Sequence, residues 1–237
     1  MSSALPPTLP TDTDDRWLDL ERWPRRQTFE FYRGFDKPYF NVCCRVDVAP
    51  LQAALAAAGP AAGGLSLACY HLTLRLAQAI EPFRYRLQGG RVRVVARLQA
   101  STAVLRDDDS LAFAYLPPAP RLQDFVRQAR ERIAVARRPQ GVFDPDGQGS
   151  EADDQEAVLH FTTLPWVHFT SFSHARNWGR EDAIPKFAFG RVDPDGIRAW
   201  MPMSVEVHHA LMDGVQVGRF VEGFEAAVAA PEDWVGR

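Results

Sequence analysis

The chain has 237 residues, of which 46% are hydrophobic, and a formal net charge of -3 at pH 7. This length and composition fit a single α/β domain with a substantial core, and the weak charge gives no general attraction to nucleic acid or to anionic lipid. The most apolar stretch, residues 67–80, carries His71, Arg75 and Gln78, and the N-terminus has no basic and apolar leader, so the sequence predicts a cytoplasmic protein without a membrane span.

The first third of the chain predicts a tail followed by a strand and two helices. Residues 1–15 are rich in Ser, Thr, Pro and Asp, which predicts a flexible tail and leaves residues 16–237 as one domain. Residues 40–48 predict a strand, because every second residue is apolar. The glycine-rich residues 59–64 predict a flexible loop. Helices bounded by proline or glycine are predicted on either side of that loop, at 50–58 and 66–80.

The middle of the chain alternates between short strands and helical periodicity. Four short segments separated by turns predict strands that form a meander: 83–87, 91–98, 101–105 and 111–116. Residues 122–136 have apolar side chains at helical spacing, which predicts an amphipathic surface helix. Residues 141–156 are acidic and rich in turn formers, but they lack the ligand spacing of a calcium-binding hand loop, so we expect a solvated loop. Residues 158–164 predict another strand.

The most informative stretch joins a strand to a helix. Residues 201–206 alternate between apolar and polar side chains, which predicts a strand with one buried face. Residues 217–228 carry apolar side chains at helical spacing. Between these two elements His208 and His209 are followed, after three residues, by Asp213 and a glycine.

Two interpretations of this motif follow from the residues alone. If the alternation continues, His209 points to the buried side of the strand and His208 points the other way. A partly buried imidazole can stay neutral and act as a general base near neutral pH. Two histidines on opposite faces cannot readily share an ion, so no metal is expected. In the alternative, Asp213 and Gln216 only cap the following helix, and Gly214 only serves the turn.

Four blocks of sequence occur in the order found in one enzyme family. They are Trp23-Pro24-Arg25-Arg26 with Phe29-Glu30-Phe31-Tyr32-Arg33, Pro165-Trp166-Val167 with Phe169, Ser171 and Phe172, Met201-Pro202-Met203-Ser204-Val205, and the His-His-x-x-x-Asp-Gly motif at 208–214. These blocks resemble the chloramphenicol acetyltransferases and the wider group of CoA-dependent acyltransferases. The resemblance implies an α/β two-layer sandwich on a mixed sheet. It also implies transfer of acetyl from acetyl-CoA, as co-substrate, to a hydroxyl of chloramphenicol or a similar small molecule.

The resemblance further implies a homotrimer with active sites between subunits. His209 would come from one subunit as the general base, and Tyr32 would come from its neighbour with much of the acceptor pocket. Phe31 and Tyr32 would line that pocket, although simple core packing is the alternative for Phe31. Neither nucleic acid nor a membrane is expected as a partner.

The resemblance assigns roles to five more residues. Thr162, four residues before Trp166, would donate its hydroxyl to the developing oxyanion, whereas the alternative is a threonine favoured only by strand propensity. Arg25 would pair with Asp213 and secure the turn that positions the base, whereas the alternative is a solvated basic residue. Trp166 would lie beside the CoA channel, and Arg191 would reach the CoA phosphate.

Three positions depart from the family pattern. Ala188 occupies the place of a threonine that holds a water in the transition state. Arg138 and Asp36 fall where the chloramphenicol enzymes have aromatic or apolar residues, and polar side chains in an apolar pocket are costly unless another acceptor satisfies them. The second hypothesis is therefore a catalytically weak, ligand-binding relative of the same fold.

Overall fold

The structure is a computed structural model that describes residues 14–138, 156–176 and 181–236. The α-helices are α1 Arg26–Tyr32, α2 Ala49–Ala58, α3 Leu65–Ala79, α4 Leu122–Ala136 and α5 Gly214–Ala229. The strands are β1 Arg16–Trp17, β2 Tyr39–Asp47, β3 Tyr85–Gln88, β4 Arg91–Val94, β5 Gln99–Leu105, β6 Leu111–Leu116, β7 Val158–Leu164, β8 Lys186–Gly190, β9 Asp193–Asp195 and β10 Arg198–His208.

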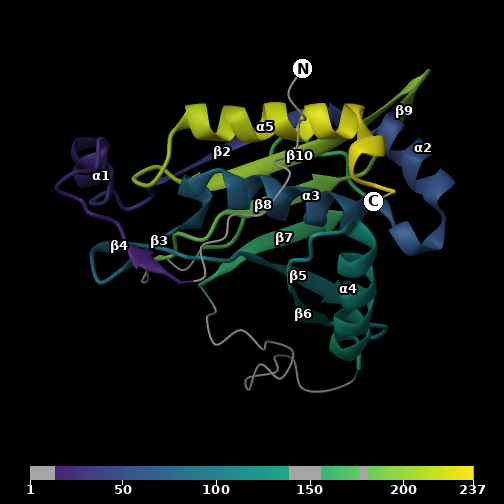
Figure 1. Ribbon diagram of the computed structural model, residues 1–237, viewed down its shortest axis with the longest axis horizontal. Helices are drawn as coiled ribbons and strands as arrows, with labels where there is room; N and C mark the ends of the chain where they lie inside the picture. Colours follow the sequence, from purple (N-terminus) through teal and green to yellow (C-terminus); the bar gives the residue numbers. More distant parts are fainter. Residues whose placement is uncertain (1–13, 139–155, 177–180, 237) are drawn as a thin grey trace.

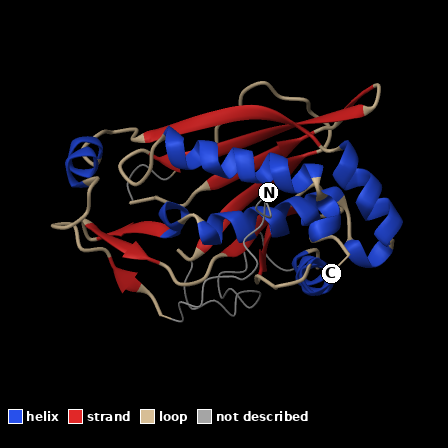
Figure 2. Cartoon of the chain, turned by 45° about the horizontal axis from the view of Figure 1, so that its top comes forward, coloured by secondary structure: helices blue, strands red, loops and turns tan. Residues whose placement is uncertain are grey.

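A seven-stranded mixed sheet forms one layer of the molecule. Its strands follow the order β2-β10-β8-β7-β5-β6, and β9 pairs with β10. Strand β7 runs parallel to β5 and β8, whereas β10 is antiparallel to β2 and β8. Figures 1 and 2 show α3 and α5 lying across one face of this sheet. The predicted α/β two-layer sandwich on a mixed sheet is therefore confirmed.

Aromatic side chains fill the space between the two layers. Phe161 on β7 stacks on Phe187 of β8, with ring centroids 5.5 Å apart, and Phe187 contacts Phe220 of α5 at 5.2 Å. All three rings are at most 2% exposed. The apolar positions that predicted helix and strand periodicity thus supply this core, and burying each ring contributes about 1.5–3 kcal/mol.

The prediction of one buried face for β10 is wrong. Every residue from Met201 to His208 is buried, including Ser204 and Glu206. The strand lies between β2 and β8, and the segment before β8 folds over its second face, where His174 donates its backbone N–H to Glu206. Alternation reports a solvated face only when nothing covers that face.

The predicted meander is also wrong. Strands β3 and β4 form a small separate sheet with β1, in the order β1-β4-β3, at the end of the molecule near α1 (Figure 1). Strands β5 and β6 form a hairpin in the main sheet, and the other edge of β5 pairs with β7. The two hairpins look alike in sequence, because each is a local pair of short strands. Their separate sheets are set by distant partners.

Most other predicted elements are present. The bounds of α4 and β7 agree with the predicted ones. Helix α2 begins one residue before its predicted start, and α3 begins and ends one residue earlier than predicted. The predicted flexible loop at 59–64 instead contains a 3-10 turn, Pro60–Ala62, with Ala62 fully buried. Asp15, the last residue of the predicted tail, binds the Ala96 N–H at 2.7 Å. Most of the predicted tail and of the acidic loop lies outside the described residues.

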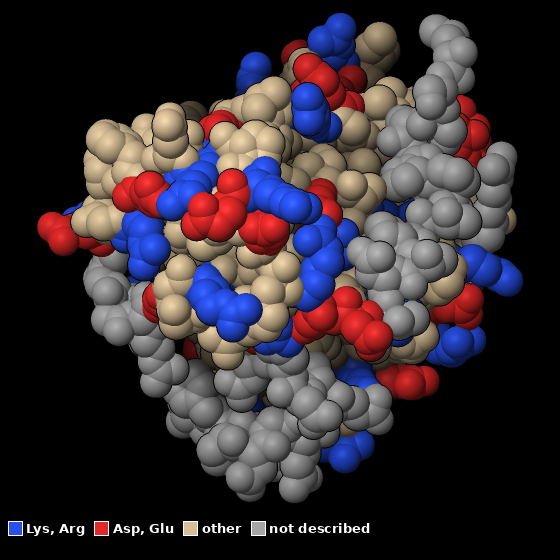
Figure 3. Space-filling model, turned by 60° about the vertical axis from the view of Figure 1, so that its left-hand side comes forward, with Lys and Arg blue, Asp and Glu red and all other residues tan. Residues whose placement is uncertain are grey.

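On the described part of the surface, positive and negative side chains are not segregated into separate patches. Figure 3 shows basic and acidic side chains interspersed on the face near α1. Ion pairs account for part of this pattern, among them Arg16 with Glu81 and Arg26 with Glu30. None of the described helices is long and apolar enough to cross a membrane.

Candidate active site

The turn between β10 and α5 is fixed by hydrogen bonds to His208. Its carbonyl accepts from the N–H groups of Leu211, at 3.0 Å, and Met212, at 3.2 Å, while its Nδ1 accepts from the Ala210 N–H at 3.2 Å. Burial lowers the pKa of His208 to about 4, so this imidazole is neutral and free to accept. The buried histidine of the motif is His208, and it shapes the turn for its neighbour.

The other side of the turn rests on a second hydrophobic cluster. Ala210 and Leu211 are at most 1% exposed and pack with Phe29 of α1 and with residues of the small sheet. Helix α5 then begins with the Asp213 N–H donating to Gln216 Oε1 at 2.8 Å. The predicted helix cap is therefore present, and the small sheet serves as a support for the turn.

Arg25 holds the turn from the far end of the sequence. Its Nε and Nη2 donate to the two carboxylate oxygens of Asp213 at 3.0 and 2.6 Å. Its Nη1 also donates to the Ala210 carbonyl at 3.0 Å, and Nη2 to the His209 carbonyl at 3.3 Å. The Arg25 side chain is 15% exposed, so the alternative of a solvated basic residue is wrong. Asp213 thus takes part in both the helix cap and the ion pair.

His209 is held between aromatic rings. Its imidazole stacks on Tyr32 with centroids 4.0 Å apart and planes 12° apart, and it meets Phe40 at 4.7 Å. Its Nδ1 lies 3.3 Å from Asp213 Oδ1, and the side chain is 31% exposed. Contact with Phe40 agrees with the predicted side of the strand, because Phe40 pairs with Val207. The ring is therefore fixed in place yet open to a ligand.

The expected supply of Tyr32 by a neighbouring subunit is wrong. Tyr32 stacks on His209 of the same chain. The cause is the ion pair of Arg25 with Asp213, since Arg25 immediately precedes α1 and fixes the start of that helix on the turn. Tyr32, at the end of the same helix, therefore lies beside His209.

Phe31 belongs to an open aromatic group rather than to the core. It is 63% exposed, so the core-packing alternative is wrong; Phe29 is the buried ring of α1. The rings of Phe31, Tyr32 and Phe35 meet one another at 5.0 to 5.1 Å. The structure thus places both predicted acceptor residues together, beside His209.

The two residues predicted to contact CoA form a second group, just after the C-terminal ends of β7 and β8. Trp166 is 65% exposed, and its carbonyl accepts from Arg191 Nη1 at 3.5 Å. The Arg191 N–H also donates to the Val167 carbonyl at 2.8 Å. Gly190 permits this approach, because a Cβ there would lie 2.8 Å from that carbonyl oxygen. The Arg191 guanidinium therefore lies against the backbone of Trp166, whose side chain is exposed.

Thr162 is far from His209 within one chain. Thr162 pairs with Ala188, and Ala188 pairs with Ser204 on β10. His209 therefore lies two strands away, about 10 Å, and five residues further along, about 16 Å. The predicted oxyanion donor and the predicted base do not meet in a single chain.

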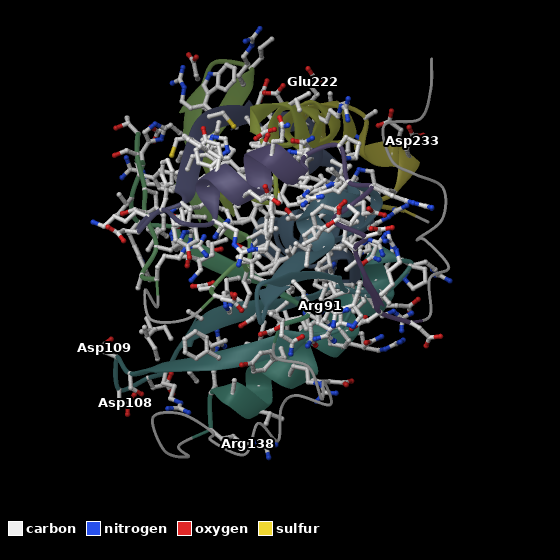
Figure 4. The ribbon with its side chains drawn as sticks, turned by 90° about the vertical axis from the view of Figure 1, so that its left-hand side faces the viewer. Arg91, Asp108, Asp109, Arg138, Glu222 and Asp233 are labelled. Carbon is white, nitrogen blue, oxygen red and sulfur yellow. The ribbon has the colours of Figure 1, made fainter. Side chains whose placement is uncertain are left out.

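The three departing residues occupy different surroundings. Asp36 lines a cavity of about 180 Å³ together with Arg33, Tyr39, Glu181 and His208, among others. Ala188 is fully buried beside Thr162. Arg138 lies just beyond α4, and Figure 4 shows it at the opposite end of the molecule from α5. Of the three, only Asp36 lies close to the turn between β10 and α5, because it shares this cavity with His208.

One group of charged residues was missed by sequence reasoning. Arg176, Asp182, Lys186 and Glu206 form a buried ion-pair network on the sheet face opposite the helices. The available signal was the presence of Lys186 and Glu206 inside otherwise apolar strands, where a charge needs a partner. Among the described residues no group of three or more His, Cys, Asp or Glu side chains is arranged to hold a metal ion.

Comparisons with known proteins agree with this architecture. Residues 15–225 match the chloramphenicol acetyltransferase family. Chloramphenicol acetyltransferase 2 of Escherichia coli is 26% identical over 208 residues, which cover 86% of this chain and 92% of that protein. The chloramphenicol acetyltransferase of Streptomyces acrimycini is 27% identical over 216 residues, which cover 90% and 94%.

Solved structures show the same fold. A chloramphenicol acetyltransferase structure matches with a TM-score of 0.77 at 24% identity, covering 90% of this chain and 98% of that one. A dihydrolipoamide acetyltransferase of Azotobacter vinelandii matches with a TM-score of 0.67 at 15% identity, covering 87% of each chain. The chain belongs to the chloramphenicol acetyltransferase family of acyltransferase enzymes.

Proposed function

We propose that the protein is an acetyl-CoA-dependent O-acetyltransferase with His209 as its general base, acting on a hydroxyl of chloramphenicol or a similar small molecule. The observation that carries this proposal is the fixed imidazole. Tyr32 stacks on it, and the ion pair of Arg25 with Asp213 holds its turn. A base held in one orientation beside an open aromatic surface suits proton removal from a bound alcohol.

The proposed reaction is direct transfer. His209 removes the hydroxyl proton as the acceptor oxygen attacks the thioester carbonyl carbon. The tetrahedral oxyanion collapses, the carbon–sulfur bond breaks, and protonated His209 returns its proton to the departing thiolate. The products are the acetyl ester and CoA. No covalent intermediate on the enzyme is needed.

Acetyl-CoA would lie against the exposed group at the ends of β7 and β8. Arg191 would pair with a CoA phosphate and Trp166 would flank the CoA channel. Thr162, two residues before the end of β7, would donate its hydroxyl to the oxyanion. Such a donor contributes about 3 kcal/mol to transition-state stabilisation. The use of acetyl-CoA as co-substrate is consistent with the cytoplasmic location that the sequence predicts.

The separation of Thr162 from His209 supports an oligomeric site. A reaction that uses both residues needs Thr162 of one copy and His209 of another, because the two are two strands and several residues apart in one chain. We therefore propose a homotrimer with active sites between subunits. Each site would combine His209, Tyr32 and Phe31 from one copy with Thr162, Trp166 and Arg191 from the next.

A second candidate function rests on Ala188. This residue lies directly beside Thr162, where a hydroxyl side chain could hold a water close to the reacting carbonyl. Its methyl group offers no hydrogen bond, and this favours a catalytically weak protein that binds ligands on the same fold. The intact arrangement of Arg25, Asp213 and His209 favours the enzyme.

The release of CoA thiol from acetyl-CoA by purified protein tests the proposal, with and without chloramphenicol and other alcohols. We expect His209→Ala to lower turnover by about 100- to 10,000-fold while acetyl-CoA binding persists. His71→Leu is the matched control, because His71 is a buried histidine that packs on Phe125 and Trp234, away from the site. Full activity of His209→Ala would remove His209 as the base. Turnover of chloramphenicol would make drug resistance the expected phenotype.

A further inference from the structure

A cavity of about 180 Å³ lies beside the turn between β10 and α5. Its described lining comes from α1 and the segment that follows this helix, from the start of β2, from the hairpin of β3 and β4, from Glu181 and from His208 at the end of β10. Figure 1 shows α1, β3 and β4 at the same end of the molecule. One water needs only ~10–15 Å³ of such volume. The cavity is therefore large enough for a chemical group of several atoms.

His208 supplies a nearly buried donor to this cavity. The residue is 5% exposed, and its Nδ1 accepts from the Ala210 N–H at 3.2 Å. Because this imidazole is neutral, its proton lies on Nε2. Within the described part of the chain Nε2 has no hydrogen-bond partner, yet it is not closed to solvent. The Nε2–H group therefore requires an accepting atom from a ligand or a water in the cavity.

Three charged side chains line the cavity without pairing with one another: Arg33, Asp36 and Glu181. The Arg33 guanidinium lies over the Phe29 ring, 5.2 Å from its centroid. The Asp36 carboxylate makes neither an ion pair nor a hydrogen bond with any described residue. One cation and two carboxylates give the lining a net negative charge. A positively charged ligand would balance it.

The turn between β3 and β4 brings two of these charges together. The N–H groups of Gly89 and Gly90 donate to the two carboxylate oxygens of Glu181 at 2.7 and 2.9 Å. Both glycines have positive φ, 58° and 72°, which side chains rarely allow. A Cβ on Gly90 would also lie 3.0 Å from Arg33 Nη2. Arg33 and Glu181 thus meet at one residue and offset each other, which leaves Asp36 as the uncompensated charge.

The cavity adjoins the proposed reaction centre through two of its lining residues. Pro38 lines it, and the Pro38 carbonyl accepts from the His209 N–H at 2.7 Å. Phe35 also lines it and is 47% exposed. The Phe35 ring lies 5.1 Å from Tyr32, and Tyr32 stacks on His209 at 4.0 Å. A small molecule that lies along Phe35 therefore has one end in the cavity and the other near the imidazole.

We propose that this cavity binds the ammonium group of the acceptor, and that the acceptor is an amino alcohol. The inference rests on the proposed function, because it takes His209 as the base for the reacting hydroxyl. Asp36 pairs with the ammonium, Phe35 flanks it, and His208 donates to an oxygen of the ligand. Asp36 departs from the family pattern, so this preference belongs to the present chain.

The ammonium takes no part in the transfer itself. A protonated amine has no free electron pair, so it cannot attack the thioester. The ester forms at the hydroxyl, His209 carries the proton to the thiolate, and the ammonium keeps its own proton. A neutral alcohol leaves the Asp36 carboxylate without a partner, and a carboxylate-bearing alcohol is repelled by it. The cavity therefore selects the acceptor by charge.

Pairs of alcohols that have the same shape and differ in charge test the acceptor class. The thiol-release assay compares dimethylammonium alcohols of increasing chain length with neutral alcohols that carry an isopropyl group at the same place. The dimethylated nitrogen keeps an N–H group for Asp36 and cannot form an amide. We expect the charged alcohol to have a kcat/KM about tenfold or more above that of its neutral partner for at least one chain length, with full dependence on His209.

The failures of the two proposals are distinguishable. Equal or lower efficiency of the charged alcohol in every pair would overturn the ammonium site and leave the transferase intact. The absence of thiol release that depends on His209, with these alcohols and with chloramphenicol, would overturn the proposed function instead.

Three variants test the lining residues through the ratio of the two kcat/KM values in the best pair. Asp36→Asn removes the uncompensated charge and should bring this ratio to within about twofold of one. Arg33→Gln removes the only cation among the three charges and should raise the ratio. Asp19→Asn, at an exposed carboxylate outside the cavity, should leave it unchanged. A wild-type ratio in both Asp36→Asn and Arg33→Gln would show that the cavity does not read charge, and would refute the proposal.

Discussion

The guanidinium of Arg25 binds both carboxylate oxygens of Asp213, at 3.0 and 2.6 Å, across 188 residues of sequence. The same group also binds the His209 and Ala210 carbonyls. One side chain therefore sets the start of α1, the turn that carries His209 and the start of α5. This contact gives the first prediction.

Asp213→Asn keeps the size of the side chain but removes its charge. The guanidinium of Arg25 then loses its ionic partner while it remains partly buried. We expect a loss of about 1–3 kcal/mol in the free energy of unfolding and at least about a tenfold drop in kcat/KM, because the imidazole is less well held. Urea denaturation and steady-state kinetics measure the two effects. Asp19→Asn is the control, because its pair with Arg22 is exposed and should contribute almost nothing. Equal effects of the two exchanges would contradict this prediction.

The ring and the hydroxyl of Tyr32 should have separate effects on the kinetics. Tyr32→Phe keeps the ring on His209 and should change mainly the KM for the acceptor. Tyr32→Ala removes a contact of about 0.5–1.5 kcal/mol and should lower kcat as well. If Tyr32→Ala retained the wild-type kcat, the stack would not position the base. The pair of variants separates orientation of the base from acceptor binding.

Mixed oligomers test whether one active site uses two chains. His209→Ala and Thr162→Val should each be nearly inactive alone. Co-expressed with different tags and purified as hybrids, they should recover activity, because some sites then combine an intact His209 with an intact Thr162. No recovery in hybrids of confirmed composition would show that both residues act within one chain or that Thr162 is not needed. A monomer in analytical ultracentrifugation would refute the interface site directly.

Arg191 should affect the co-substrate and not the acceptor. Arg191→Ala should raise the KM for acetyl-CoA by about tenfold, since a charge-assisted bond to phosphate contributes about 1.5–3 kcal/mol, and Arg191→Lys should restore part of that loss. The acceptor KM should stay unchanged in both. The prediction fails if Arg191→Ala alters the acceptor KM instead.

Three histidines whose pKa values are lowered by burial should make the fold sensitive to mild acid. Burial lowers the pKa of His71 to about 3 and the pKa values of His160 and His208 to about 4. In the unfolded chain these three histidines bind protons from about pH 6.5 downwards. In the folded chain the same histidines stay neutral until about pH 4. Stability is full above pH 6.5 and should fall as the pH drops towards 4, by up to about 1.4 kcal/mol per pH unit and histidine.

Urea midpoints measured between pH 7 and pH 5 check this dependence. His71→Leu should flatten the slope by about one third, because it removes one of three similar groups. A slope equal to that of the wild type would mean that His71 does not contribute.

Local periodicity predicted the elements well, and distant contacts decided what it could not. The bounds of α4 and β7 were predictable because their apolar spacing is regular and their ends are marked. The separation of β3 and β4 from β5 and β6 was not, since it depends on pairing with β1 and β7.

The candidate site was predictable where it lies in a motif. His209, Asp213 and Arg25 lie together as expected, whereas the partition of Tyr32 between subunits was wrong, because it is set by a contact between the two ends of the chain. The network of Arg176 and Asp182 has no periodic signal at all. Only Lys186 and Glu206, as charges inside apolar strands, could have indicated it.

The contact between Arg25 and Asp213 also bears on the order of events in folding. Contacts between residues so far apart in sequence close late, because the intervening chain must be ordered first. His209 is therefore placed only after α1, the small sheet and α5 have all come together. During refolding, enzymatic activity should return after helical circular dichroism, so that catalysis itself reports completion of the fold.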